Sequence, residues 1–143
     1  MRRLDLADMD EAACVFRRSF DQAMPSLKGL HTPAEDRAFF GERLFAACEM
    51  WGVFGHNGMK GFIAFRDGWI DQLYVLPRER GQGAGSSLLM VAQRSFDSLQ
   101  LWTFQRNLQA RRFYEAHGFS LVRETDGFDN EEKEPDALYL WTR

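Results

Sequence analysis

Asp71-Gln-Leu-Tyr-Val-Leu-Pro-Arg-Glu-Arg-Gly-Gln-Gly-Ala-Gly-Ser-Ser-Leu-Leu-Met90 is the stretch that decides the fold of this sequence of 143 residues. Residues 73–76 are apolar or aromatic and predict a strand, which Pro77 ends because proline has no N–H for a sheet. A basic, glycine-rich turn follows over residues 78–85. From residue 86 to about residue 96, apolar side chains recur at helical spacing. The stretch therefore predicts a strand, a glycine-rich turn and an amphipathic helix in direct succession.

A turn of this kind can hold an anion at the start of its helix. The first amides of a helix have no partner within it, and the helix dipole adds about half a positive charge there. Glycines let the backbone approach a phosphate closely, and Arg78 and Arg80 add positive charge. No Walker sequence occurs, and the dinucleotide pattern Gly-x-Gly-x-x-Gly fits Gly81 and Gly83 but meets Ser86 in its third place. An ordinary strand-to-helix turn stays open as the alternative.

Two motifs together resemble a known superfamily. Arg80-x-x-Gly83-x-Gly85 resembles the acyl-CoA diphosphate loop of the GNAT superfamily of N-acyltransferases, whose pattern is Gln/Arg-x-x-Gly-x-Gly/Ala. A second stretch, Asn107-Leu-Gln-Ala-Arg-Arg-Phe-Tyr-Glu-Ala-His-Gly-Phe119, predicts a short helix that Asn107 begins and Gly118 ends. It looks like the superfamily's second CoA-contacting helix. The motifs stand in the family's order with one predicted strand between them, so we expect a member of this superfamily.

The bulk properties indicate a single domain over residues 1–143. A hydrophobic content of 45% and a charged content of 27% are ordinary for a soluble protein, and a net charge of −3 creates no basic field for nucleic acid. No apolar run approaches the length of a membrane span, and the first residues lack the apolar segment of a signal peptide. We therefore expect a cytoplasmic protein with no nucleic-acid or membrane partner.

The cysteines and histidines form no metal-binding pattern. Cys14 and Cys48 lie in separate predicted helices, and neither a Cys-x-x-Cys motif nor a pair of histidines at ligand spacing occurs. We therefore expect no metal site. His31, His56 and His117 have no visible serine or cysteine partner in the sequence, so no catalytic triad is expected.

The elements are predicted in the order β-α-α-β-β-β-α-β-α-β-β, which favours an α/β fold with a mixed sheet and helices on both faces. The first helix is expected to start with a capping box over residues 8–11, and the second with the cap Thr32, Pro33 and Glu35. The buried face of the second helix is expected to continue through Phe40 and Leu44 to Ala47. The predicted strands cover residues 3–6, 51–55, 60–65, 69–76, 99–104, 119–123 and 137–141.

The resemblance implies a V-shaped splay between the fourth and fifth strands, residues 69–76 and 99–104. Unpaired backbone groups in such a splay can bind the pantetheine arm of acetyl-CoA like an added strand. Acetyl-CoA is therefore the implied cosubstrate, with no metal. The residues expected to bind it are Leu73, Val75, Arg80, Gly81, Gln82, Gly83, Ala84, Gly85, Ser86, Asn107, Phe113 and Tyr114.

Acetyl transfer to an amine requires a neutral amine, hydrogen-bond donors for the oxyanion and a proton for the departing thiolate. Tyr114 matches the superfamily's general-acid position, and the resemblance implies that it protonates the thiolate. Asp71, on the strand before the glycine-rich turn, is the candidate base, acting directly or through water. An exposed carboxylate without a catalytic role is the equally open interpretation of Asp71.

Six acidic residues and a single cation, Lys133, lie between positions 126 and 136. They predict either a solvated hairpin loop or an acidic rim that concentrates a cationic amine. The sequence thus favours an N-acetyltransferase whose acceptor is an amine of a small molecule or peptide, with a small cationic amine expected. A non-catalytic acyl-CoA-binding sensor or protein-interaction module and a nucleotide-binding domain stay open as alternatives. A homodimer is compatible with the resemblance, although no feature requires it.

Overall fold

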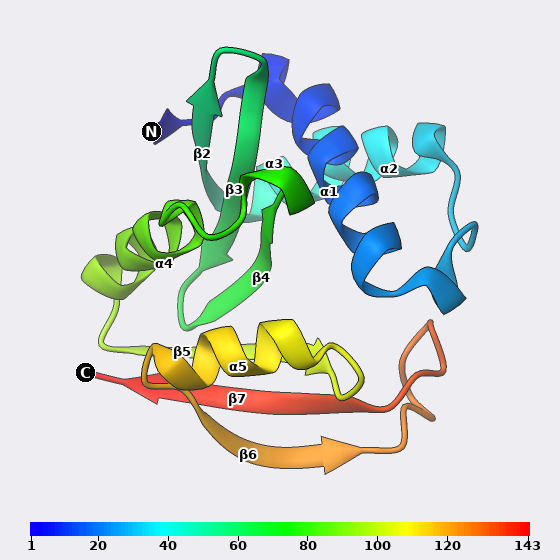
Figure 1. Ribbon diagram of the computed structural model, residues 1–143, viewed down its shortest axis with the longest axis vertical. Helices are drawn as coiled ribbons and strands as arrows, with labels where there is room; N and C mark the ends of the chain where they lie inside the picture. Colours follow the sequence, from blue (N-terminus) through cyan, green and yellow to red (C-terminus); the bar gives the residue numbers. More distant parts are fainter.

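A seven-stranded sheet with strand order β1-β2-β3-β4-β5-β7-β6 forms the centre of the computed structural model, which describes residues 1–143 (Figure 1). The strands are β1 (Arg2–Arg3), β2 (Glu49–Gly55), β3 (Gly58–Arg66), β4 (Trp69–Val75), β5 (Ser98–Phe104), β6 (Ser120–Thr125) and β7 (Asp136–Thr142). The helices are α1 (Met9–Ala23), α2 (Pro33–Phe39), α3 (Phe45–Ala47), α4 (Ala84–Ser95) and α5 (Leu108–Ala116). None of these helices combines the length and apolar character that crossing a membrane requires.

The sheet is divided by a gap between β4 and β5. All other neighbouring strands pair antiparallel, whereas β4 and β5 run parallel and share one residue pair, Trp69 with Gln100. The N–H of Gln100 also donates to the Gly68 carbonyl at 2.8 Å. Beyond this point the strands diverge, so β2–β4 and β5–β7 form two arms of a V (Figure 1). The element order and the splay expected from the family resemblance are confirmed.

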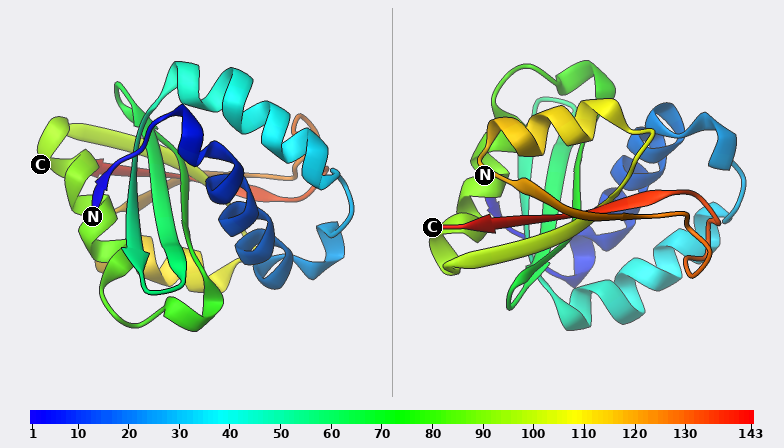
Figure 2. Two further views of the ribbon diagram at one scale, coloured as in Figure 1. Left: turned by 90° about the horizontal axis from the view of Figure 1, so that it is seen from above. Right: turned by 90° about the horizontal axis from the view of Figure 1, so that it is seen from below.

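Helices cover both faces of the sheet, and alternate side chains of β3 serve two separate cores. Phe62 and Ala64 pack with α1 and with Phe40 after α2, whereas Ile63 and Phe65 pack in a cluster that includes residues of α4 and α5. In both views of Figure 2, α2 and α5 lie on opposite sides of the sheet. The gap between β4 and β5 therefore opens toward different helices on its two faces.

The first helix begins differently from the sequence prediction. Asp5 caps a short 3-10 turn, Leu6–Asp8, and the Asp8 carboxylate completes this earlier capping box by accepting the Asp5 N–H at 2.8 Å. Arg2 donates two further hydrogen bonds to Asp8, at 2.8 and 2.9 Å. Asp8 therefore makes no side-chain cap for α1. Glu11, predicted to belong to that cap, accepts the Met59 N–H at 2.7 Å and ties α1 to the β2–β3 hairpin.

The second helical segment begins as predicted and then changes phase. The Thr32 N–H donates to Glu35 Oε1 at 2.8 Å, and the Glu35 N–H donates to Thr32 Oγ1 at 3.1 Å, which confirms the capping box. Between α2 and α3 the chain forms a π turn, Phe40–Leu44. Its wider spacing rotates the following residues around the helix axis. Phe40 and Leu44 are buried, but Ala47, predicted to share their face, is exposed.

The stabilising role of the ion pair between Arg2 and Asp8 can be tested with Asp8→Asn. Asparagine keeps an oxygen that can accept the Asp5 N–H but cannot form the ion pair with Arg2. We expect a decrease of about 0.5–1 kcal/mol in the free energy of unfolding at pH 7, measured by urea unfolding. Asp10→Asn, at an exposed position in the first turn of α1, is the matched control. Equal stability of Asp8→Asn and the wild type at pH 7 would contradict this role.

The pH dependence of the same pair has a definite sign. The hydrogen bond from Arg2 is the main cause that lowers the pKa of Asp8 from 3.8 to about 2. Because the folded-state pKa lies below the unfolded value, the stabilisation is complete above about pH 4–5 and decreases as the pH falls toward 2. The stability difference between wild type and Asp8→Asn should therefore shrink over this range.

Candidate functional site

The loop before α4 presents backbone N–H groups to open space. Gly81 and Gly83 have φ values of +80° and +85°, and a Cβ at either position would meet no atom within 4 Å. The helix begins at Ala84, two residues earlier than predicted, and its first hydrogen bond runs from the Ser87 N–H to the Gly83 carbonyl at 3.0 Å. The amides of the first three helical residues therefore have no helical partner. This concave set of donors suits a phosphate.

The helix α5 packs directly on the start of α4. A Cβ at Gly85 would lie 3.1 Å from the Phe113 ring, closer than most Cβ contacts, so a larger residue would require the ring to shift. Asn107 begins α5 by accepting the Ala110 N–H at 3.2 Å, and Gly118, with a φ of +89°, follows its end. Both predicted ends of this helix are confirmed.

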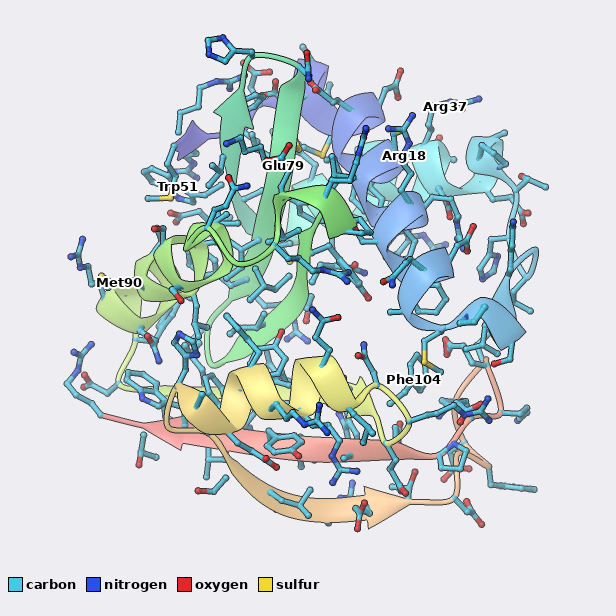
Figure 3. The ribbon with its side chains drawn as sticks, viewed as in Figure 1. Arg18, Arg37, Trp51, Glu79, Met90 and Phe104 are labelled. Atoms are coloured by element: carbon cyan, nitrogen blue, oxygen red, sulfur yellow. The ribbon has the colours of Figure 1, made fainter.

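A cavity of about 290 Å³ lies between β4, the glycine-rich loop and α5. All but one of the predicted CoA-binding residues line it, and the exception, Gln82, is exposed in the loop. The Arg80 side chain connects this loop to two helices. Its Nη1 donates to Gln22 on α1 at 2.9 Å and to Gln109 on α5 at 3.0 Å. Burial lowers the pKa of the Arg80 guanidinium. Glu79, which Figure 3 labels in the turn before the loop, is also among the residues that line this cavity.

The edge of β4 that faces the gap presents the backbone of Leu73 and Val75. The Leu76 N–H donates to the Lys60 carbonyl on the β3 side at 2.8 Å. Because backbone groups alternate in direction along a strand, those of Leu73 and Val75 point away from β3. The Ser19 hydroxyl donates to the Val75 carbonyl at 3.2 Å. A ligand that carries amides can pair with this edge as an added strand would.

Tyr114 lies in the same cavity with a buried ring and a hydroxyl that has no hydrogen-bond partner in the protein. Its side chain is 7% exposed, and the ring contacts those of Phe113 and Phe119 at centroid distances of 5.3 and 5.4 Å. Burial raises the pKa of the phenol well above its ordinary value of 10. The hydroxyl therefore stays protonated at neutral pH and is free to donate to a ligand.

A second cavity, of about 530 Å³, lies between β5, the end of β6 and the β6–β7 loop, and α1 lines it through Phe20. Tyr74 and Asn107 line both cavities, so the two meet at these residues. Phe104, at the end of β5, is part of its wall, and Figure 3 shows this residue where the chain leaves the sheet for α5. The other aromatic residues of the wall are Phe20, Trp102 and Phe128.

The acidic residues between β6 and β7 divide into structural and cavity-lining groups. Glu134 is buried and pairs with Arg106 at 3.0 Å, so it holds the loop together. The lining carboxylates are those of Asp126, Asp129, Glu132 and Asp136, of which Asp129 and Glu132 make no hydrogen bond or ion pair within the protein. The buried Glu134 departs from the interpretation of a solvated loop, and the attraction of a cationic amine by the lining carboxylates stays a prediction.

The charges that line the second cavity affect the pKa of Tyr74, which lies at the gap. Burial, and after it the Glu132 carboxylate, raises the pKa of Tyr74 well above its ordinary value. One cation, Arg123, also lines the second cavity, and its guanidinium lies 5.4 Å from the centre of the Trp102 ring. The second cavity therefore carries a negative charge on its walls.

Asp71, the candidate base, lies outside both cavities. Its Oδ2 accepts a hydrogen bond from Arg66 Nε at 2.9 Å and another from the Cys48 thiol at 3.2 Å. The thiol is also inert, because burial and the neighbouring carboxylate raise the pKa of Cys48 to about 12. The structure thus does not bring Asp71 to the other predicted site residues. No group of three or more His, Cys, Asp or Glu side chains is placed to hold a metal ion.

His117 belongs to the first cavity, although no sequence pattern indicated it. Its Nε2 lies 2.9 Å from Ser86 Oγ, and its Nδ1 lies 2.7 Å from the Phe113 carbonyl oxygen. The structure therefore gives His117 a serine partner that the sequence did not show, but its other nitrogen faces a backbone carbonyl and not the carboxylate of a triad. Ser86 lies 31 residues earlier in the sequence, and only the packing of α5 on α4 brings the two together.

Comparisons with known proteins agree with this geometry. A curated relative, the peptidyl-lysine N-acetyltransferase YiaC of Escherichia coli (strain K12), is 32% identical over 63 residues, or 43% of each chain. The match thus spans less than half the length of this relative. Among solved structures, apo YjaB from Escherichia coli has a TM-score of 0.82 at 22% identity and covers 98% of this chain and 95% of that one.

PaiA N-acetyltransferase from Thermoplasma acidophilum, solved in complex with coenzyme A, has a TM-score of 0.72 at 18% identity, over 99% of this chain and 97% of that one. At such identities these likenesses show the fold alone. Residues 16–119, well over half of the chain, match the model of one family. This match shows that the chain belongs to the acetyltransferase (GNAT) family.

Proposed function

We propose that the protein transfers the acetyl group of acetyl-CoA to a primary amine by direct attack, without a covalent enzyme intermediate. The observation that carries this proposal is the first cavity, which has unpaired helix amides at one end and the free Tyr114 hydroxyl within it. The family match supports it, as does the likeness in fold to PaiA N-acetyltransferase, which was solved with coenzyme A.

The residues of the first cavity fit the parts of acetyl-CoA. The diphosphate suits the amides at the start of α4 and the positive charge of Arg80. The amides of the pantetheine arm suit the free backbone edge of Leu73 and Val75 and the side chain of Asn107. The thioester then lies toward Tyr114, close to where the two cavities meet.

The proposed chemistry uses groups on both sides of the gap. The amine attacks the acetyl carbon from the second cavity, and a backbone N–H of Leu73 or Val75 stabilises the oxyanion. As the C–S bond breaks, Tyr114 donates its proton to the departing thiolate, and solvent later restores it. Glu132, which lines the second cavity, replaces Asp71 as the base that takes the amine proton, directly or through water.

The second cavity supports a small acceptor with more than one positive charge. Its volume of about 530 Å³ is within the usual range for small-molecule sites. Carboxylates favour the ammonium form of a nearby amine, whereas the attacking amine must be neutral. Asp126 and Asp129 therefore suit a second, non-reacting cation of the acceptor better than they suit the amine that reacts. A diamine or polyamine has this arrangement of charges.

A lysine side chain of a peptide is the second acceptor class, favoured by the activity in the name of the E. coli relative. To separate the two classes, acetyl-CoA and either amines or lysine peptides are mixed with the protein, and thiol release is followed. Cys14 is exposed and reacts with thiol reagents, so protein without acetyl-CoA is the blank. Turnover with diamines above that with lysine peptides is the expected result.

The same experiment tests the activity itself. Acetyl-CoA should raise the melting temperature, and at least one amine should give thiol release in proportion to protein concentration. Stabilisation by acetyl-CoA without turnover on any amine or peptide would favour an acyl-CoA-binding module instead. No stabilisation by acetyl-CoA at millimolar concentration would contradict both functions.

The proposed acid is tested by Tyr114→Phe, which removes the hydroxyl and keeps the buried ring. We expect kcat to fall about 10- to 100-fold, with the affinity for CoA within about twofold of wild type, because only thiolate protonation is lost. Tyr139→Phe is the control, since this buried tyrosine lies outside both cavities and its hydroxyl bonds Arg111 and Glu115. It should lower stability and preserve kcat. A Tyr114→Phe variant with wild-type kcat at all pH values would refute the assigned role.

The acceptor charge is tested by Asp126→Asn combined with Asp129→Asn. For 1,4-diaminobutane we expect kcat/KM to fall about tenfold, mainly through KM, whereas butylamine should change less than about twofold. Glu131→Gln is the matched control, because Glu131 lies in the same loop, outside the cavity, and pairs with His31 at 2.9 Å. Equal losses for both amines would mean that these carboxylates do not bind a second cation.

A further inference from the structure

A chain of hydrogen bonds connects α5 to the start of α4 through His117. The Phe113 carbonyl oxygen lies 2.7 Å from His117 Nδ1, and Ser86 Oγ lies 2.9 Å from His117 Nε2. The imidazole also stacks on the Phe113 ring, with 4.3 Å between centroids. Ser86 is the third residue of α4, so its hydroxyl lies next to the amides that have no helical partner. The side chain of Ser86 thus connects His117 to the proposed diphosphate site.

The Phe113 carbonyl determines which nitrogen of His117 carries hydrogen. A carbonyl oxygen only accepts hydrogen bonds, so Nδ1 is the donor in this contact. In the neutral ring Nε2 is then bare, and the Ser86 hydroxyl must donate to it. While His117 is neutral, the hydroxyl hydrogen of Ser86 therefore points at the ring and away from any anion at the loop.

A bound diphosphate competes with neutral His117 for the hydroxyl hydrogen of Ser86, because its oxygens also only accept hydrogen bonds. For Ser86 to donate to it, the bond to neutral His117 must break. If Nε2 takes up a proton from solvent, the direction reverses: Nε2–H donates to Ser86 Oγ, and the hydroxyl is free to donate to the anion. The cation on the ring also attracts the anion. A proton on His117 and a diphosphate at α4 thus favour each other.

We propose that His117 is a cofactor-binding residue that couples the binding of CoA to the uptake of one proton, relayed through the Ser86 hydroxyl. This inference rests on the proposed function, since the diphosphate is that of acetyl-CoA. The charged and titratable groups in the same cavity are Glu79 in the turn before the loop, Arg80 in the loop, Tyr74 on β4 and Tyr114 on α5. From α4, neutral Gln93 donates to the His117 carbonyl at 3.5 Å.

The expected result is tighter binding as the pH falls from 8.5 to 5.5. Acetyl-CoA and CoA carry the same diphosphate, so both affinities should change together. The coupling therefore affects KM for acetyl-CoA and the release of CoA, and it leaves the proton transfers at the thioester unchanged. A charge-assisted contact of this kind changes affinity by about five- to tenfold.

The test is calorimetric titration of the whole protein with dephospho-CoA between pH 5.5 and 8.5. This probe lacks the 3′-phosphate, whose own titration near pH 6 would otherwise add to the signal, and keeps the fully ionised diphosphate. For the wild type, Kd should rise about five- to tenfold over this range. Titrations near pH 7 in buffers of different ionisation enthalpy should show the uptake of a fraction of one proton.

Two variants separate the relay from a purely structural role for His117. His117→Gln retains a side chain that can bond Ser86 but cannot take up a proton, so its Kd should change less than about twofold with pH. Ser86→Ala removes the relay but keeps the imidazole, so its pH dependence should be weaker than that of the wild type and should reflect only the direct attraction between the charged ring and the anion. Thermal melting checks that both variants fold.

The outcomes are distinct. A wild-type pH profile in His117→Gln, or in Ser86→Ala, would overturn the relay while leaving the binding of CoA intact. Wild-type affinity that does not change with pH would do the same. If the wild type bound neither CoA nor dephospho-CoA at any pH, the proposed function would fail, and this inference with it.

Discussion

The separation of β4 from β5 after one residue pair is the constraint on which the rest of the structure depends. Two parallel neighbours need a crossover connection, and here α4 is that connection, so the loop that starts it lies at the open end of the gap. The same separation leaves the backbone of Leu73 and Val75 unpaired on one edge. Of these backbone groups, only the Val75 carbonyl accepts a hydrogen bond, from the Ser19 hydroxyl. The glycine-rich loop and the free strand edge therefore have one topological cause.

The two cavities at the gap differ because different segments line them. In the first cavity, close packing at Gly85 between α4 and α5 creates a narrow space lined by amide donors and apolar walls. In the second cavity, the β6–β7 loop supplies carboxylates that the fold does not neutralise. Tyr74 and Asn107 stand at the boundary and line both cavities. The proposed transfer would join its two ligands at this boundary.

Features that depend on neighbours in the sequence were predictable, whereas those that depend on distant contacts were not. The caps at Thr32 and Asn107 are local, and their hydrogen bonds span three residues. Asp8 could belong either to the capping box of the 3-10 turn or to the cap of α1. Its hydrogen bonds with Arg2, which lies outside the helix pattern, favour the 3-10 turn. Asp71 was assigned from its strand alone, although Cys48, 23 residues away, shares its carboxylate. The gap itself was foreseen through family resemblance, because no local signal encodes a failure of pairing.

The two cavities that meet at the gap differ in the charges of the groups that line them. Unpaired amides and Arg80 make the first cavity attractive to an anion, and the unneutralised carboxylates make the second attractive to a cation. Between them lie two phenols, Tyr74 and Tyr114, which burial keeps protonated and therefore uncharged. Glu79 in the first cavity and Arg123 in the second are the exceptions to this division of charge. In the proposed reaction, the polyphosphate thioester enters from the first cavity and the cationic amine from the second, and the amine loses its proton and reacts at the uncharged boundary between them.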